Sequence, residues 1–148
     1  MLFTIGYEGQ TIESYLAELR RARVTLLCDV RRNPISHKRG FSKGGLARAC
    51  AAAGIRYEHL PELGIASERR RGLKTPADFD ALFAEYERET LPDQKPAIAR
   101  IVSWLRAGER VALTCFERDA KRCHRRRVAR AVSRAGRLPA AVDLAPAA

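Results

Sequence analysis

The sequence lacks the features that mark secreted, membrane-spanning or repetitive proteins. It has four cysteines in 148 residues but no Cys-x-x-Cys pair, and it opens on a strand-like MLFTIG instead of a charged leader followed by an apolar segment. No apolar run approaches the length of a membrane span, and there are no repeats, low-complexity segments or internal linkers. These absences predict a single domain over residues 1–148, with a frayed tail at 143–148. We expect a cytoplasmic protein with reduced cysteines and no membrane partner.

Acidic residues are also scarce in this chain. There are 17 of them against 28 lysines and arginines, which gives a formal net charge of +11. A charge of that size attracts polyanions, so an anionic small molecule or a nucleic acid is the expected partner. A second interpretation stands beside this one. Arginine outnumbers lysine 23 to 5 and alanine is abundant, as a GC-rich genome would produce by itself.

Strand-like and helix-like patterns alternate along the chain. The predicted strands cover residues 2–6, 24–30, 55–60, 110–115 and 138–144. Predicted helices follow the capping residue Thr11, span 46–53, begin at Thr75-Pro76, carry an apolar face at 98–105, and cover about 120–135 up to Gly136. Strands that alternate with helices pair in parallel, so we predict an α/β fold with an open, layered sheet and helices on both faces.

Residues that a core does not explain follow the predicted strands. Ligands of parallel sheets bind beyond the carboxyl ends of the strands, where loops and helix N-termini meet. Four segments place charged or nucleophilic groups there: Tyr7 and Glu8; Asp29, Arg31, Arg32 and His37; His59 and Glu62; and Cys115, Glu117, Cys123, His124 and Arg125. We therefore predict that Asp29, Arg31, Glu117 and His124 lie in one pocket at this edge.

One long irregular segment, residues 61–75, begins at the same edge. A loop of this length in a small domain is usually functional or mobile. Because it carries the basic run Arg69-Arg70-Arg71, we predict a flap over the pocket, with Glu62 and these arginines near its mouth.

The stretch TCFERDAKRCHRRR, residues 114–127, admits several kinds of chemistry. Cys115, Cys123 and His124 are metal-ligand types, although C-x7-C-H is not a recognised structural zinc spacing and adjacent ligands are awkward to aim. Alternatively, Cys123 near a helix N-terminus is a candidate nucleophilic thiolate. A stretch with no chemistry at all is the remaining possibility. The two other cysteines, Cys28 and Cys50, lie in apolar patterns and are predicted core residues.

A third chemistry uses carboxylates and has the best support. Glu117 and Asp29 would act as acid/base or substrate-binding groups, while three basic residues hold an anion: Arg31, His124 and Arg125. Asp119 is the expected N-cap of the last helix. It would place Cys123 one turn inside the helix, where the effect of the helix dipole has weakened, and so in a supporting role.

Four motifs carry a resemblance to a known family. They are TIGYEG, CDVRRNPISHKRGFSK, IRYEHLPELG and LTCFERDAKRCHR, in family order. Over roughly residues 3 to 143 the chain resembles the small bacterial and archaeal proteins grouped as domain of unknown function 488. The resemblance implies a Rossmann-like α/β domain, and implies fold better than activity. It points to Gly6, Glu8, Asp29, Arg31, Pro34, Leu60, Glu62, Gly64, Cys115, Glu117, Cys123, His124 and Arg125. The family often has Asp-Pro where this chain has Asp119-Ala120.

These observations together predict an anionic, nucleotide-like or nucleic-acid ligand at the C-terminal rim of the sheet. The favoured chemistry is hydrolysis by Glu117 and Asp29, with ligand contacts from Glu8, Arg31, His59, Glu62, His124 and Arg125. Two alternatives stay open: a non-enzymatic, basic nucleic-acid-binding module, and an enzyme that depends on Cys123. We expect no cofactor and no resident metal.

Overall fold

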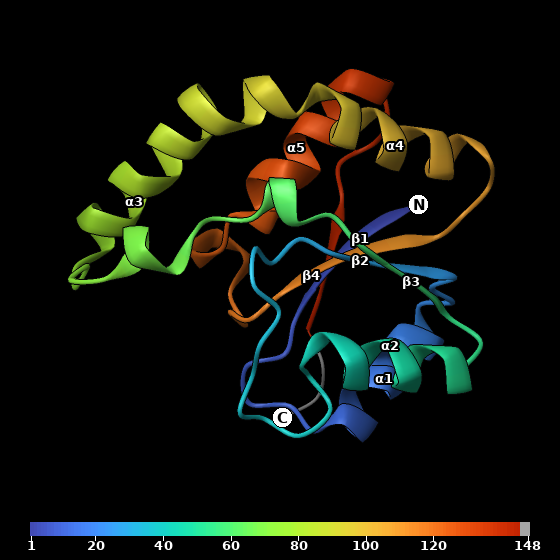
Figure 1. Ribbon diagram of the computed structural model, residues 1–148. Coiled ribbons are helices and arrows are strands. Elements are labelled where there is room, and N and C mark those ends of the chain that lie inside the picture. The colour runs from blue at the N-terminus through green and yellow to red at the C-terminus, as the bar shows by residue number, and fades with distance from the viewer. Residues whose placement is uncertain (146–148) are drawn as a thin grey trace.

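Five short strands form one open, all-parallel sheet in this computed structural model, which describes residues 1–145 (Figure 1). They are β1 Leu2–Gly6, β2 Leu26–Asp29, β3 Arg56–His59, β4 Val111–Cys115 and β5 Val142–Leu144. Their order in the sheet is β3-β2-β4-β1-β5. Every residue of β1, β2 and β4 is buried, as their continuous apolar runs predict, whereas the edge strands β3 and β5 are partly exposed. The Rossmann-like α/β domain is confirmed.

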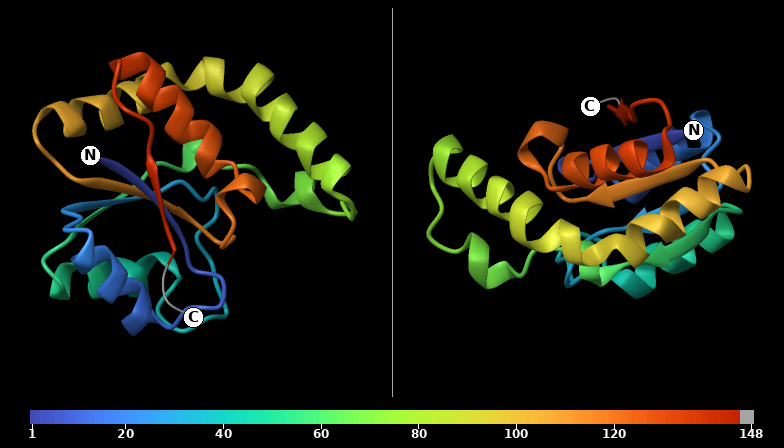
Figure 2. Two further views of the ribbon diagram at one scale, coloured as in Figure 1. Left: turned by 180° about the vertical axis from the view of Figure 1, so that it is seen from behind. Right: turned by 90° about the horizontal axis from the view of Figure 1, so that it is seen from above.

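Helices cover both faces of the sheet (Figures 1 and 2). The helices α1 Ile12–Arg21 and α2 Lys43–Ala52 pack on one face, around a core that includes Tyr15, Leu19, Leu46 and Cys50. The helices α4 Lys95–Arg106 and α5 Arg125–Gly136 pack on the other, around Ile98, Ile101, Val128 and Val132. Helix α3 Pro76–Glu85 leads into α4 through the π-turn η3 Tyr86–Thr90 and the 3-10 turn η4 Leu91–Gln94, in one arc (Figure 1).

Helix starts follow the predicted capping residues. The Thr11 hydroxyl accepts a hydrogen bond from the backbone N–H of Ser14 at 3.0 Å, and Thr75 accepts one from Asp78 at 3.1 Å. Both motifs are reciprocal capping boxes, which satisfy amides that have no partner inside the helix. Gly54 follows α2 with a φ of +75°, a conformation that favours glycine.

The last helix begins later than the sequence predicts. A 3-10 turn, η5 Ala120–Arg122, precedes it, and α5 starts only at Arg125. Asp119 caps η5 by accepting from the Lys121 amide at 2.9 Å, so its prediction as the N-cap of the helix is wrong. Cys123 has an extended backbone between the two elements and does not lie one turn inside the helix. The helix ends at Gly136, but the left-handed residue after it is Arg137, with a φ of +53°.

Two further predictions need correction near the rim and at the C-terminus. Residues 61–75 are not wholly irregular, since they hold the 3-10 turns η1 Pro61–Leu63 and η2 Ser67–Arg70. The predicted frayed tail begins too early, because Asp143 and Leu144 pair with β1, and Thr4 donates a hydrogen bond of 2.6 Å to the Asp143 carboxylate. Residues 146–148 of that tail lie outside the described residues.

Within residues 1–145 no helix has the length and apolar character needed to cross a bilayer.

Candidate functional site

A cavity of about 290 Å³ lies at the carboxyl edge of the central strands, and we call it the rim pocket. Strand β4 lies between β1 and β2, so the segments that follow these three strands meet there. Of the four residues predicted to share one pocket, Arg31, Glu117 and His124 line it. The fourth, Asp29, is fully buried and is bonded to Arg31. The prediction of one shared pocket is therefore confirmed for Arg31, Glu117 and His124, whereas Asp29 lies directly behind Arg31.

Asp29 is engaged on both carboxylate oxygens. The Arg31 guanidinium donates to Oδ1 at 2.8 Å and to Oδ2 at 2.6 Å, and the Tyr57 hydroxyl donates to Oδ2 at 2.6 Å. Burial opposes the charge of Arg31, but the hydrogen bonds and the charge of Asp29 outweigh it, and the pKa of Arg31 is raised. The Arg31 guanidinium also donates to the Tyr7 hydroxyl and to the Phe41 carbonyl, at 3.1 and 2.6 Å. In this arrangement Asp29 fixes the position of Arg31 and has no oxygen free to act as a base.

Glu117 projects into the rim pocket from the turn after β4. Its side chain is about a quarter exposed, at 23%, and its Oε1 accepts a hydrogen bond from Arg70 at 3.0 Å. Arg70 comes from η2, in the segment predicted as a flap, and lines the pocket together with Ile65 and Ser67. The predicted contact between residues 61–75 and the pocket is therefore confirmed. Glu62 from the same segment is exposed and does not line the cavity.

His124 is buried and neutral. Its Nε2 lies 2.8 Å from the Val30 carbonyl, and its Nδ1 lies 3.1 Å from an Arg70 guanidinium nitrogen. A carbonyl only accepts and a guanidinium only donates, so the proton is on Nε2 and the lone pair is on Nδ1. Burial, with the nearby arginines, lowers the pKa of His124 to about 4. The residue therefore offers the pocket an acceptor and no positive charge at neutral pH.

Arg125 supports the turn that presents Glu117. The residue is fully buried, and its guanidinium donates to the backbone carbonyls of Glu117 at 2.5 Å and Arg118 at 3.2 Å. Burial lowers the pKa of Arg125. The same turn presses against β1, because a Cβ on Gly6 would overlap the Glu117 carbonyl. Arg125 lies outside the pocket lining, so its direct effect is on the backbone that carries the carboxylate.

Cys115, which lines the rim pocket, meets Cys123, which does not line it. Cys115 and Cys123 are joined as a disulfide, so the expectation of four reduced thiols is wrong for this pair. The end of β4 and the turn before α5 bring them together across eight residues. Cys115 is buried at the strand end, as predicted, and its Sγ lies 3.4 Å from Glu117 Oε2. Cys28 and Cys50 are free and fully buried in the core, which confirms their prediction.

Besides Arg125, three further predicted ligand-binding residues lie outside the pocket lining. The carboxylate of Glu8 accepts from the Arg118 backbone amide at 2.9 Å, and His59 Nε2 lies 2.7 Å from the Arg31 carbonyl. Glu62 is the third. Two lining residues that sequence reasoning did not single out are the apolar Ile35 and Phe116, 81% and 46% exposed. In the sequence, the only feature that could have marked Ile35 and Phe116 as pocket residues is that each is an apolar side chain within a charged motif.

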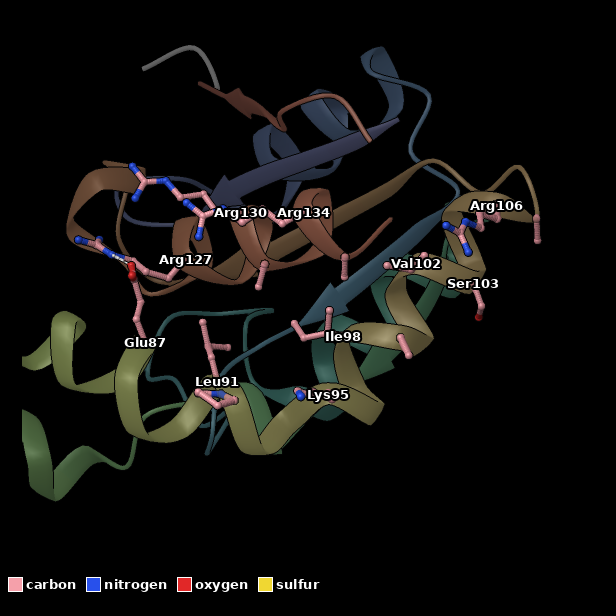
Figure 3. Close-up of a pocket in the computed structure, with 15 residues that line it drawn as sticks. Glu87, Leu91, Lys95, Ile98, Val102, Ser103, Arg106, Arg127, Arg130 and Arg134 are labelled. Carbon is pink, nitrogen blue, oxygen red and sulfur yellow. Dashed lines mark hydrogen bonds and ion pairs between the residues drawn. The ribbon is translucent and has the colours of Figure 1, made fainter. Parts of the chain in front are cut away.

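A larger groove of about 900 Å³ lies between α4 and α5 (Figure 3). Its apolar lining includes Leu91, Ile98 and Val102, and basic side chains of α4 and α5 surround it: Lys95, Arg106, Arg127, Arg130 and Arg134. Arg127 is paired with Glu87 at 3.2 Å. No residue predicted for the site lines this groove.

Fold and site together define a Rossmann-like α/β protein with an arginine-lined pocket at the carboxyl edge of its sheet. A family model described as "Domain of unknown function DUF488" matches residues 11–132. The match covers most of the chain, so the protein belongs to this family. Neither the curated proteins nor the solved structures contain a match to this chain.

Proposed function

We propose that the protein binds a phosphate-bearing, nucleotide-like ligand in the rim pocket and hydrolyses it with Glu117 as the acid/base group. The observation that carries the proposal is the charge of the lining. One carboxylate, that of Glu117, shares the cavity with three guanidinium groups, those of Arg31, Arg32 and Arg70. Arg31 is also paired with the buried Asp29, so one positive charge remains in excess at the pocket. This excess favours an anionic ligand, and the planar guanidinium suits phosphate oxygens in particular.

The three arginines differ in how free they are to bind a ligand. Arg31 is held by Asp29 and presents a fixed charge. Arg32 is exposed and forms no ion pair within the described part of the chain. Arg70 is paired with Glu117 and has a side chain 29% exposed, so an incoming anion can compete for it. Arg32 and Arg70 are therefore the residues on which ligand affinity should depend most.

Exposed apolar groups beside these charges support a ligand that also carries a ring. Ile35 and Phe116 both line the pocket, although they are two of the most exposed large apolar residues described. Phe116 packs edge-on against Tyr7, with ring centroids 5.3 Å apart, which orients its ring. Aromatic side chains stack on nucleobases, so a base beside Phe116 and a phosphate among the arginines would fit one nucleotide.

The chemistry follows from the ion pair that an anionic ligand would disturb. When phosphate oxygens bind Arg70, Glu117 is released from its partner and becomes able to accept a proton from an attacking water. The water oxygen would bond to phosphorus while the bond from phosphorus to the leaving oxygen breaks. The guanidinium groups would stabilise the negative charge that develops on the phosphate and on the leaving oxygen, which then takes a proton from solvent. Asp29 acts as a positioning residue in this scheme, because it holds Arg31 in place.

A screen of nucleotides, nucleosides and oligonucleotides tests the proposal by thermal shift and by product release. Glu117→Gln should abolish turnover and keep ligand binding, while Arg32→Ala should weaken binding. Glu58→Gln is the control, because Glu58 is an acid of β3 outside the pocket. Full turnover in Glu117→Gln would refute the assigned role.

The groove between α4 and α5 supports a second candidate, binding of nucleic acid without catalysis. Four of its cations form no ion pair within residues 1–145: Lys95, Arg106, Arg130 and Arg134. Cations gathered on two neighbouring helices give the positive patch that attracts a phosphate backbone. The double variant Arg130→Ala/Arg134→Ala should then weaken binding and flatten its salt dependence, and Glu117→Gln should leave binding unchanged. Binding that resists salt would exclude this candidate.

A further inference from the structure

Three buried side chains of metal-ligating type meet at the rim pocket, and two of them, Cys115 and His124, line it. The Sγ atoms of Cys115 and Cys123 and a ring nitrogen of His124 lie within 4.8 Å of one another. Thiolate sulfur and neutral imidazole are the donors that zinc prefers in proteins. We infer that this cluster, with its cysteines reduced, binds one Zn²⁺ ion through Cys115, Cys123 and His124.

The imidazole of His124 is already oriented for a metal ion. Its Nε2–H donates to the Val30 carbonyl, which leaves the lone pair of Nδ1 on the side of Cys123, with Nδ1 and Sγ 3.8 Å apart. The Arg70 guanidinium, 3.1 Å from Nδ1, is the group that a metal ion would displace. Metal-ligating histidines commonly have this second hydrogen bond to a backbone carbonyl, because it fixes the tautomer and the ring. Two ligands adjacent in sequence, Cys123 and His124, are difficult to direct at one ion from within a helix. Cys123 has an extended backbone and lies before α5, so this difficulty does not apply.

Hydrogen-bond donors point at both sulfur atoms. The guanidinium of Arg125 lies 3.1 Å from Cys115 Sγ, and the Arg125 backbone N–H lies 3.5 Å from Cys123 Sγ, at the start of α5. Such donors stabilise negative charge on sulfur, so they favour thiolates more than a neutral disulfide. The Cα atoms of the two cysteines are 7.3 Å apart, wider than the roughly 4.4–6.8 Å usual for a disulfide. That separation leaves room for an ion between two thiolates.

Zn²⁺ binding by the disulfide-bonded protein requires two steps, reduction and metal binding. A thiol reductant gives two electrons and two protons to the Cys115–Cys123 bridge and is itself oxidised to a disulfide, which leaves two thiols on the protein. Zn²⁺ then binds the two sulfur atoms and Nδ1 of His124, and the two thiol protons pass to solvent. Metal binding and bridge formation therefore exclude each other.

Three protein ligands leave a fourth zinc position, and the geometry directs it toward the cavity. Cys115 and His124 both line the rim pocket, and Glu117 Oε2 lies 3.4 Å from Cys115 Sγ. Zinc sites with two cysteines and one histidine hold a water there, and a nearby glutamate can take its proton. This role of the ion rests on the proposed hydrolytic function, whereas the binding of the ion does not.

Cobalt absorption tests the inference directly. Protein reduced with a phosphine under nitrogen should bind one Co²⁺ per chain, with the charge-transfer band of thiolate ligation, and Zn²⁺ should displace it. Loss of a residue that only hydrogen-bonds to a metal ligand can lower metal affinity by about 100-fold. Loss of a direct ligand should cost more, so Cys115→Ser and Cys123→Ser should each weaken Co²⁺ binding by more than about 100-fold. Cys50→Ala is the control, since Cys50 is free and lies in the core on the opposite face of the sheet.

Thiol protection in the wild-type protein gives a second measurement that needs no variant. Zn²⁺ should shield Cys115 and Cys123 from alkylation after reduction. A reduced protein that shows no charge-transfer band, or a band that survives in both serine variants, would overturn the inference. Thiols that close again in air and never bind Co²⁺ would also overturn it, and would make the pair a thiol–disulfide couple. Glu117→Gln should retain Co²⁺, so loss of turnover there tests the proposed function alone.

Discussion

The guanidinium of Arg70 lies 3.0 Å from the carboxylate of Glu117, although 47 residues separate the two in the chain. A second nitrogen of the same guanidinium lies 3.1 Å from His124 Nδ1. One cation from the segment after β3 therefore neutralises the acid and occupies the imidazole acceptor of the rim pocket. A ligand anion or a metal ion must compete with that cation, so Arg70 controls access to both groups.

Arg70→Ala should have opposite effects on the two kinds of ligand. Loss of the guanidinium removes an anion-binding charge, so nucleotide affinity should fall about 10-fold, which corresponds to roughly 1.4 kcal/mol. Co²⁺ affinity of the reduced protein should rise, because Nδ1 of His124 is freed. Arg69→Ala is the matched control, since Arg69 pairs with Glu85 outside the pocket. Titration calorimetry and cobalt absorption measure the two effects, and equal changes in Arg69→Ala would contradict the prediction.

Gly6→Ala should destabilise the protein and disturb the site. The added Cβ would overlap the Glu117 carbonyl, which is backbone and cannot turn aside. We expect a loss of about 1–3 kcal/mol in the free energy of unfolding, together with reduced turnover. Gly44→Ala is the control, because Gly44 is in α2 and a Cβ there meets only the end of the Arg48 side chain, at 3.3 Å. That variant should change the free energy of unfolding, measured with urea, by less than about 1 kcal/mol.

Asp29→Ala should be among the most damaging substitutions at the site. It leaves the buried guanidinium of Arg31 without its partner, and an uncompensated buried charge destabilises a protein by about 3–5 kcal/mol. Glu58→Ala removes an acid from the neighbouring strand β3 whose partner Arg56 is half-exposed, so it should change stability by less than about 1 kcal/mol. Urea unfolding of both variants checks the contrast. Similar losses would show that Asp29 carries no special role.

Stability of the metal-free protein should fall as the pH is lowered from about 6.5 toward 4. Burial lowers the pKa of His124 from 6.5 to about 4, so the unfolded chain binds a proton in this range and the folded protein does not. The contribution is complete above the unfolded pKa and lost as the pH falls through the folded one, up to roughly 3 kcal/mol. Unfolding with a chelator present should show this slope in the wild type and in His37→Gln, whose side chain is exposed. His124→Gln should flatten it.

Local patterns in the sequence were enough to predict the fold class. Continuous apolar runs gave the buried strands β1, β2 and β4, and the capping residues Thr11 and Thr75 marked two helix starts, because these signals act between residues close in the chain. Ligand-binding groups gather at the carboxyl edge of parallel strands. This rule correctly predicted, without the strand order, that Arg31, Glu117 and His124 share one pocket.

Only the tertiary structure decided what those residues do. Asp29 and Arg125 have the chemistry of catalytic and anion-binding groups in the sequence, yet the fold turns the first toward Arg31 and the second toward the Glu117 carbonyl. Cys123 lies between the end of η5 and the start of α5, outside the helix, and in this position its sulfur is bonded to that of Cys115. These outcomes depend on contacts between distant segments, and the energy of a buried charge or thiol is set by whichever group packs against it. A local sequence pattern contains no information about that partner.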